Sequence, residues 1–159
     1  MPEVRRADPD DAAELTRLRV IMFTDMGRDP GLLDDDWHRR NVAHFRRRLA
    51  ETDLFAAYVV DRPGGVLAAS AVGWLNEHLI GTTNPVGKVG YIANMCTDPE
   101  HRRRGYGRAT LVALLAWLRS TGITTVDLHA TPDGAPLYRS LGFAAPTDPA
   151  LTLRFPPRP

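Results

Sequence analysis

The chain has 159 residues, of which 43% are hydrophobic and 25% are charged, a composition typical of one soluble globular domain. Its 20 basic and 19 acidic residues give a net charge of +1, which provides no general attraction for nucleic acid or for a membrane surface. The one cysteine, Cys96, excludes an internal disulfide and fits a reducing compartment. The polar N-terminal sequence lacks the apolar core of a signal peptide, and we expect a cytoplasmic protein.

The first half of the chain predicts, in order, a strand, two helices and a pair of strands, over residues 3–7, 8–26, 37–51, 54–60 and 66–75. Asp8 is the expected N-cap of the first helix, and Pro9 is its first helical residue. An acidic, turn-rich loop separates the two helices. The Asp-Arg-Pro-Gly-Gly sequence between the paired strands predicts a hairpin turn.

The second half predicts a strand, a helix, a strand, a short helix and a last strand, over residues 91–97, 108–121, 123–130, 131–141 and 151–155. The first of these helices has an apolar stripe at helical spacing, formed by Leu111, Leu114, Leu115 and Leu118. We expect residues 1–155 to form a single domain, followed by a proline-rich tail at residues 156–159.

A basic loop that contains two glycines joins the strand at residues 91–97 to the helix that follows it. Gly105 and Gly107 remove two Cβ atoms where the loop becomes a helix, so a ligand can approach the backbone closely. The first turn of a helix has N–H groups without internal partners, and its dipole favours an anion. Arginines surround these glycines, namely Arg102, Arg103, Arg104 and Arg108. The loop therefore predicts a phosphate-binding site.

Two common phosphate-binding motifs do not fit this loop. A P-loop needs a lysine after the last glycine, and a dinucleotide-binding loop needs a third glycine where Thr110 stands. The spacing Arg102-x-x-Gly105-x-Gly107 instead resembles the Gln/Arg-x-x-Gly-x-Gly/Ala signature of the GCN5-related N-acetyltransferase (GNAT) family. In that family the signature binds the pyrophosphate of acetyl-coenzyme A. The preceding Thr-Asp-Pro-Glu-His is also similar to the family's usual approach to the signature.

A second stretch, residues 131–143, resembles the family's Asn-x-x-Ala-x-x-Leu-Tyr-x-x-x-Gly-Phe landmark. The Leu-Tyr and Gly-Phe pairs match in place, whereas Thr131 replaces the usual asparagine and Gly134 the usual alanine. The resemblance covers nearly the whole chain and implies the GNAT fold. That fold is of the α/β (α+β) class, with a central, mostly antiparallel mixed sheet of six to seven strands flanked by four helices.

The resemblance also implies the chemistry. Acetyl-coenzyme A would be the cosubstrate, an amine would attack it directly in a ternary complex, and no metal is expected. Tyr138 takes the position of the general acid that protonates the departing thiolate. Backbone N–H groups of the strand would contact the pantetheine and the acetyl oxygen, and Thr110 would add a hydroxyl for a phosphate. The implied coenzyme-binding residues are Met95, Cys96, Thr97, Arg102, Arg103, Arg104, Gly105, Tyr106, Gly107, Arg108, Thr110 and Thr131.

Several assignments stay open on the sequence. No carboxylate lies between Gly90 and Thr97, so the general base is a water chain or one of four side chains, Glu77, His78, Asn94 and His129. The side chain of Cys96 lies in an apolar strand, which favours a core residue over a nucleophile. The five histidines show no metal-ligand spacing. Residues 46–48 are three arginines that we interpret as an exposed helix face.

The acceptor also stays open. A small amine is our first hypothesis, and a protein N-terminus or lysine is the second. A non-catalytic acyl-coenzyme A-binding module is the third, which the presence of Tyr138 disfavours. The loop between the first two helices contains carboxylates that either attract a cationic amine or form a solvated loop with a helix cap, namely Asp25, Asp29, Asp34, Asp35 and Asp36. We expect no nucleic-acid or membrane partner, and the sequence leaves a homodimer open.

Overall fold

The computed structural model describes residues 2–159 and divides into two compact units, one up to His129 and one from Ala130 onwards. The first unit contains β1 (Arg5–Arg6), α1 (Ala12–Asp25), α2 (Asp35–Leu49), β2 (Phe55–Arg62), β3 (Val66–Glu77), β4 (Lys88–Thr97), α3 (Tyr106–Ser120) and β5 (Val126–Leu128). Short 3-10 turns occur at Pro9–Asp11, Pro30–Leu32 and Pro99–His101. The second unit contains α4 (Ala135–Ser140).

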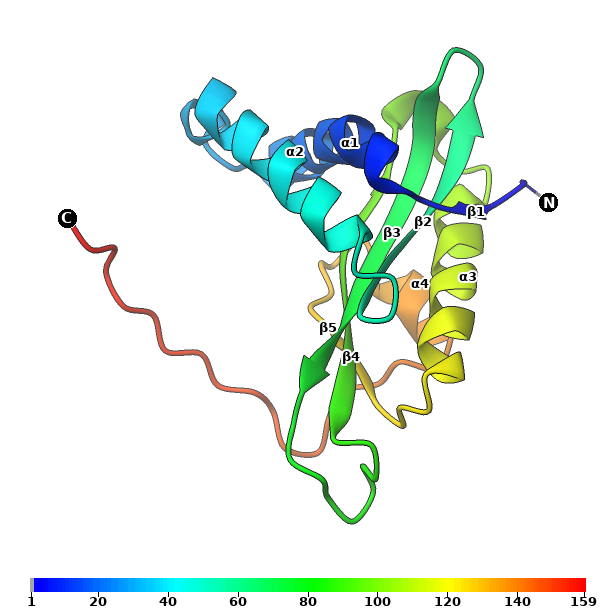
Figure 1. Cartoon of the computed structure of the whole chain (residues 1–159), viewed down its shortest axis with the longest axis vertical. Helices are drawn as coiled ribbons and strands as arrows, with labels where there is room; N and C mark the ends of the chain where they lie inside the picture. The colour runs from blue at the N-terminus through cyan, green and yellow to red at the C-terminus, as the bar shows by residue number, and fades with distance from the viewer. Residues whose placement is uncertain (1) are drawn as a thin grey trace. The chain divides into compact units, whose positions relative to one another are not determined.

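The first unit is built on one mixed sheet with the strand order β1-β2-β3-β4-β5 (Figure 1). The first four strands pair antiparallel to one another, and β5 pairs parallel to β4. This confirms the predicted α/β class and the mostly antiparallel mixed sheet. The described residues form five strands rather than the six or seven expected.

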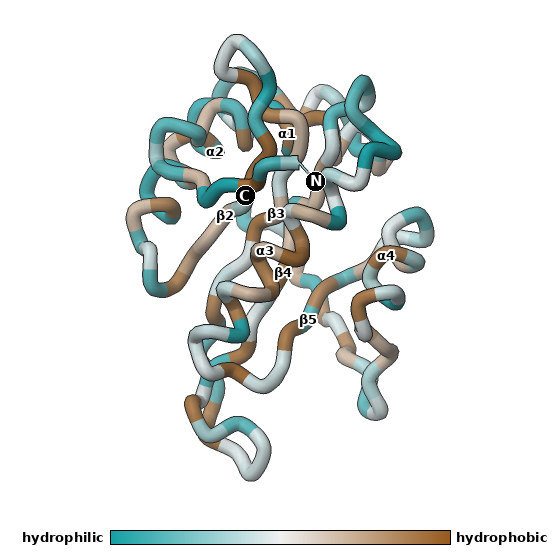
Figure 2. Tube along the Cα trace, turned by 90° about the vertical axis from the view of Figure 1, so that its right-hand side faces the viewer, coloured by the Kyte–Doolittle hydropathy of each residue, from teal (hydrophilic) through white to brown (hydrophobic). Residues whose placement is uncertain are grey.

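Helices cover both faces of this sheet. On β3, Val72 packs in a core cluster with Leu15 and Leu18 of α1. At the next residue, Gly73, a Cβ atom would lie 3.2 Å from the Leu114 methyl groups of α3. Because neighbouring strand residues point to opposite faces, α1 and α2 lie on one face and α3 on the other. Figure 2 shows hydrophobic segments in brown along α3 and the neighbouring strands.

Local caps explain where the helices begin. The Asp8 carboxylate accepts a hydrogen bond of 2.8 Å from the Asp10 N–H, which confirms its role as an N-cap, although the first turn is 3-10 before α1 starts at Ala12. The Asp34 carboxylate accepts from the Trp37 N–H at 2.8 Å, so α2 begins at Asp35, two residues earlier than predicted. Gly105 has the left-handed φ of 78° directly before α3.

The second unit corrects one prediction. The expected strand at residues 151–155 is wrong, because these residues have no regular structure and Leu151, Leu153 and Phe155 are exposed. A short segment of alternating apolar residues needs a neighbouring strand for hydrogen bonding, and the prolines around this segment remove backbone donors.

In the first unit, the strand predicted at residues 123–130 is shorter than expected, and it corresponds to β5. Among residues 2–159, no helix combines the length and the apolarity needed to cross a bilayer.

Candidate active site

The central feature of the site is a bulge in β4. Ser70 pairs with Cys96, but two residues further along β3, Val72 pairs with Ala93, so β4 contains one additional residue between these pairs. Asn94 lies in this interval and has the left-handed φ of 55°. Asparagine tolerates this conformation better than most residues, and such a bulge bends its strand locally.

Beyond the bulge, one edge of β4 pairs with no strand formed by residues 2–159. Pairing with β5 ends where Ile92 lies opposite Leu128. The Asp98 N–H donates to the Ala68 carbonyl at 2.8 Å, and therefore points toward β3. Backbone direction alternates along a strand, so the N–H groups of Met95 and Thr97 point to the opposite edge, past the end of β5. This unpaired edge of β4 is where the family resemblance implies that the acetyl group binds.

Cys96 differs from its two neighbours. The same alternation directs its N–H toward β3, so we leave it out of the donors to the acetyl group. Its side chain is buried in the core cluster beneath α1 and α2. Burial raises the pKa of its thiol to about 11, so the thiol stays protonated at neutral pH. The interpretation of Cys96 as a core residue agrees with this geometry.

The start of α3 forms an open cradle. The first intrahelical bond runs from the Ala109 N–H to the Gly105 carbonyl at 3.0 Å, so the N–H groups of Tyr106 and Gly107 precede the helical ladder. The nearest atom to a Cβ built on Gly107 would be the Thr97 hydroxyl, at 3.5 Å. The side chains of residues 102–104 are exposed around this point. These features suit the pyrophosphate of a coenzyme.

Two members of the predicted cradle have structural roles. The Tyr106 ring packs against a small core cluster of Val60, Ala68 and Ala69, so this residue offers its backbone rather than its phenol. Thr110 is fully buried, and its hydroxyl donates to the carbonyls of Tyr106 and Gly107 at 3.1 and 3.0 Å. A hydroxyl buried in this way does not reach a phosphate, so we leave Thr110 out of the coenzyme site.

Arg102 connects the cradle to α1. Its Nε donates to the Thr97 carbonyl at 3.1 Å, and its Nη2 forms an ion pair with the Asp25 carboxylate at the end of α1. Both side chains are about half exposed, at 44% and 51%. An exposed pair of this kind is weak, so a pyrophosphate can compete with Asp25 for Arg102.

The other acids between α1 and the first turn of α2 mostly have structural partners. Asp29 accepts from the Gly31 N–H at 2.9 Å, Asp34 caps α2, and Asp36 pairs with Arg39 at 3.1 Å. These partners favour the interpretation of the acids as a solvated loop with a helix cap.

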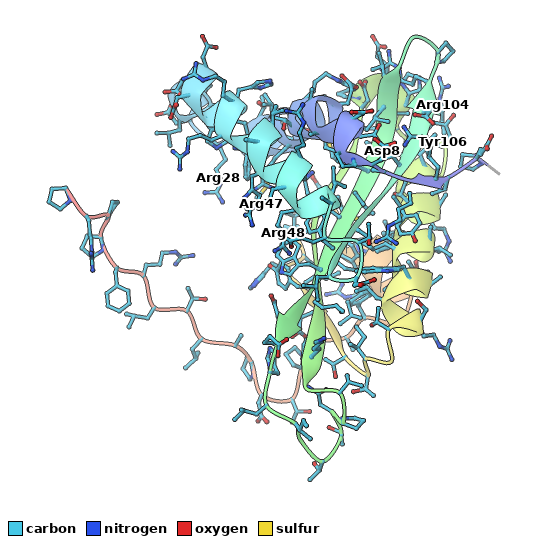
Figure 3. All side chains as sticks on the ribbon, in the orientation of Figure 1. Asp8, Arg28, Arg47, Arg48, Arg104 and Tyr106 are labelled. Atoms are coloured by element: carbon cyan, nitrogen blue, oxygen red, sulfur yellow. The ribbon has the colours of Figure 1, made fainter. Side chains whose placement is uncertain are left out.

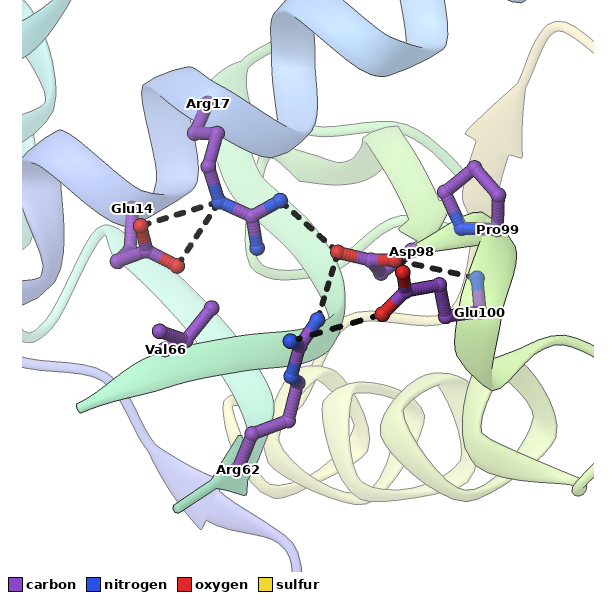
Figure 4. Close-up of a pocket in the computed structure, with 7 residues that line it drawn as sticks. All are labelled: Glu14, Arg17, Arg62, Val66, Asp98, Pro99 and Glu100. Atoms are coloured by element: carbon purple, nitrogen blue, oxygen red, sulfur yellow. Dashed lines mark hydrogen bonds and ion pairs between the residues drawn. The ribbon is translucent and has the colours of Figure 1, made fainter. Parts of the chain in front are cut away.

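A buried carboxylate anchors the loop after β4. Asp98 accepts hydrogen bonds of 2.9 Å from both Arg17 and Arg62, and one of 3.2 Å from the Glu100 N–H (Figure 4). Burial opposes ionisation of Asp98, but the two guanidinium groups outweigh it and lower its pKa. These residues line a hollow of about 470 Å³. The Thr-Asp-Pro-Glu-His motif contains Asp98, but nothing in the sequence indicated its partners Arg17 and Arg62, which lie far away in the chain.

The same loop brings together three groups that can bind metals. Ligand atoms of Asp98, Glu100 and His101 lie within 4.8 Å of one another. However, Arg17 and Arg62 already neutralise the Asp98 carboxylate at 2.9 Å, and their charges oppose a divalent cation. We therefore interpret this group as an anchor of the loop.

The candidates for the general base lie at different distances from the bulge. Glu77 pairs with Lys88, seven residues before Met95, which places Glu77 about 23 Å from Met95 at roughly 3.3 Å per residue. His78 follows Glu77 and lies farther still, so neither can act directly. His129 is exposed beside Tyr91, with ring centroids 6.0 Å apart. Asn94 is buried, and its amide has no useful basicity.

The second unit contains the predicted general acid. The Tyr138 ring packs edge-on against Phe143, with centroids 6.0 Å apart. Burial raises the pKa of Tyr138, so the phenol keeps its proton at neutral pH. Thr131 stabilises the turn before α4, since its hydroxyl accepts from the Gly134 N–H at 3.3 Å.

The basic residues of α2 form a surface separate from the cradle. Arg47 and Arg48 project on the side of the first unit away from Arg104 and Tyr106 (Figure 3). The Arg48 guanidinium lies over the Phe55 ring, 5.0 Å from its centroid, and Arg47 pairs with Glu51 at 3.4 Å. These contacts agree with the predicted helix face.

Comparisons with known proteins agree with this geometry. The model of the acetyltransferase (GNAT) family matches residues 16–143. A predicted acetyltransferase from Clostridium acetobutylicum, solved with acetyl-CoA, has a TM-score of 0.83 at 28% identity, over 97% of this chain and 96% of that one. A glucosamine 6-phosphate N-acetyltransferase from Trypanosoma brucei brucei is 30% identical over 105 residues, which cover 66% of this chain and 67% of the relative.

A mycothiol acetyltransferase from Thermobispora bispora is 38% identical over 92 residues. The match covers 51% of this chain but only 30% of the relative, so the similarity is confined to one part of that longer protein.

Proposed function

Since the chain belongs to the acetyltransferase (GNAT) family, we propose that it transfers an acetyl group from acetyl-coenzyme A to a primary amine of a small molecule. The observation that carries this proposal is the free edge of β4, where Met95 and Thr97 direct N–H groups past the end of β5. The backbone at Gly107, in the first turn of α3, is open on its Cβ side except for the Thr97 hydroxyl. The glucosamine 6-phosphate relative supports a small acceptor.

In the proposed reaction, the amine nitrogen attacks the thioester carbon while the carbonyl oxygen accepts hydrogen bonds from Met95 and Thr97. The bond from carbon to sulfur then breaks, and the leaving thiolate is protonated by a general acid, a role that we assign to Tyr138 from its place in the Leu-Tyr motif of the sequence. The proton lost by the amine goes to solvent, by way of water or His129. Backbone donors suit this task because they are fixed in place before the charge develops.

Direct transfer is favoured over an acyl-enzyme. The one cysteine near the site, Cys96, is 8% exposed, and its thiol has a pKa of about 11. A nucleophilic cysteine needs its thiolate form, which this environment disfavours. We therefore expect both substrates to bind before transfer occurs.

A thiol-release screen tests the proposed function. Purified protein and acetyl-coenzyme A are incubated with amines, aminoglycosides, amino acids and peptides, and coenzyme A release is compared with acetylated product by mass spectrometry. Release with a small amine, in equal amount to the product, supports the proposal. Activity on peptides alone would favour a protein acceptor. Coenzyme binding without transfer to any amine would favour a non-catalytic binding module.

A further inference from the structure

A half-buried arginine lies next to the β4 bulge without a counter-charge. Arg19 of α1 donates from Nη1 to the Asn94 side-chain oxygen at 3.0 Å, and its guanidinium lies 4.6 Å from the centroid of the Phe23 ring. No carboxylate among residues 2–159 forms an ion pair with it, and burial lowers its pKa. A cation withdrawn from water in this way is stabilised when an anion binds beside it.

The neighbouring Asn94 also lacks one partner. Its residue is only 5% exposed, and its side-chain nitrogen, Nδ2, is buried without a hydrogen-bond partner. An arginine can only donate, so the atom of Asn94 that faces Arg19 is the oxygen, and the orientation of the amide is determined. A buried donor without a partner is unfavourable, and a bound acceptor group would satisfy it.

Nearby charges make the surroundings more positive. The pKa of His44 on α2 is lowered by burial and then by Arg47, Arg48 and Arg19, with only Glu51 acting in the opposite direction. Asp25, the acid at the end of α1, forms its ion pair with Arg102 in the ligand-free protein and not with Arg19. The site thus combines one uncompensated cation, Arg19, with one unused amide donor on Asn94, the residue directly before Met95 in β4.

We propose that Arg19 and Asn94 form an acceptor subsite for an anionic group, so that the preferred acceptor is a small amine that also carries a carboxylate or a phosphate. This inference rests on the proposed function, because it places the acceptor next to the acetyl group on β4. The anion would accept hydrogen bonds from the Arg19 guanidinium and the Asn94 Nδ2. The coenzyme phosphates have their own donors at the start of α3, beyond Thr97.

The test compares acceptors that differ in the anion. Ethanolamine and phosphoethanolamine form the phosphate pair, and alaninamide and alanine form the carboxylate pair. Binding of each probe to the protein saturated with coenzyme A is measured by calorimetry, and kcat and KM are measured with acetyl-coenzyme A. Variants are Arg19→Gln, Arg19→Lys as a charge-conserving rescue, and Arg119→Gln as the control. Arg119 is an exposed arginine of α3, on the opposite face of the sheet.

We expect the anionic member of at least one pair to bind more tightly to the wild type. Arg19→Gln should weaken that binding by about 10- to 100-fold, the usual loss for a hydrogen bond to a charged group, and should raise KM more than it lowers kcat. The neutral probe should change little, Arg19→Lys should recover part of the preference, and Arg119→Gln should match the wild type. The pair that responds distinguishes a phosphate from a carboxylate.

Other results would overturn the subsite. These are a wild type without preference for either anionic probe, an equal loss for neutral and anionic probes in Arg19→Gln, or a similar loss of acetyl-coenzyme A affinity in that variant. The binding and kinetic readouts separate the two proposals. Anion binding that depends on Arg19 without any turnover supports the subsite and rejects the proposed function. Turnover without anion preference supports the function and rejects the subsite.

A second variant guards against misfolding. Asn94→Asp tolerates the left-handed backbone, keeps an acceptor for Arg19, and supplies the missing negative charge within the protein. It should therefore remove the anion preference while the far-UV circular dichroism spectrum and the melting temperature stay close to those of the wild type. An Asn94→Asp protein that folds and still prefers the anionic probe would contradict the subsite.

Discussion

Replacement of Gly107 by aspartate tests the proposed coenzyme cradle. A Cβ atom at this position has the Thr97 hydroxyl as its nearest neighbour, at the ordinary contact distance of 3.5 Å, so the fold should accept the side chain. Gly107 lies in the first turn of α3, where a carboxylate interacts favourably with the helix dipole. Aspartate also has a higher helix propensity than glycine, by roughly 0.3 kcal/mol. The ligand-free variant should therefore melt no lower than the wild type.

The same substitution should strongly weaken coenzyme binding. A carboxylate about 6 Å from a pyrophosphate repels it by roughly 3 kcal/mol per unit charge at an effective dielectric constant of 20. That energy corresponds to a loss of affinity of more than about 100-fold. The effect is electrostatic, so Gly107→Ala, which adds only a methyl group, should lose much less.

Thermal shift with acetyl-coenzyme A measures this difference. A ligand at 100 times its dissociation constant stabilises the folded protein by about 2.7 kcal/mol, which falls to about 0.4 kcal/mol when affinity drops 100-fold. At roughly 2–4 °C per kcal/mol, the wild type should gain about 5–11 °C and Gly107→Asp less than about 2 °C. A shift in Gly107→Asp equal to that of the wild type would show that the pyrophosphate binds elsewhere.

Four further changes probe other parts of the site. Tyr138→Phe should lower kcat by about two to four orders of magnitude without changing coenzyme affinity, and activity within about threefold of the wild type would reject the general acid. Arg102→Glu should raise the coenzyme dissociation constant in calorimetry, whereas Arg47→Glu on the separate basic surface should not; equal effects would indicate only long-range charge. Asp25→Asn should tighten coenzyme binding up to about fivefold at low salt, because an exposed ion pair is worth about 0.2–1 kcal/mol; weaker binding would instead show that Asp25 holds Arg102 in place. Asp98→Asn should lower the free energy of unfolding by about 2–3 kcal/mol at pH 7. Because the pKa of Asp98 is lowered in the folded protein, this stabilisation is present above about pH 4 and is lost as the pH falls through the lowered value, so urea unfolding at pH 3 should show a smaller difference than at pH 7.

Local patterns explain why several structural features around the candidate site could be predicted. The Asp8 cap bonds to a residue close by in the chain, and Gly105 allows the left-handed turn directly before α3, so both features can be recognised in a short stretch of sequence. The apolar stripe of α3 is equally local: three of its four leucines, Leu111, Leu114 and Leu118, are fully buried, and Leu115 is partly buried. The alternation of apolar residues at 151–155 led to a wrong strand prediction, because a strand also requires a neighbouring strand to pair with.

The sequence by itself determined the order of the helices and main strands and the place of the glycine-bearing loop before α3, because caps, periodicity and glycine spacing depend on residues close together in the chain. Only the tertiary structure decided what the distant side chains do. It buried Thr110, paired Asp25 with Arg102, and brought Arg19 to Asn94 across 75 residues of sequence. The bulge at Asn94 is likewise a property of two strands in register, so β4 alone could not reveal it. Contacts of this kind exist only after the sheet has paired and α1 has packed on its face.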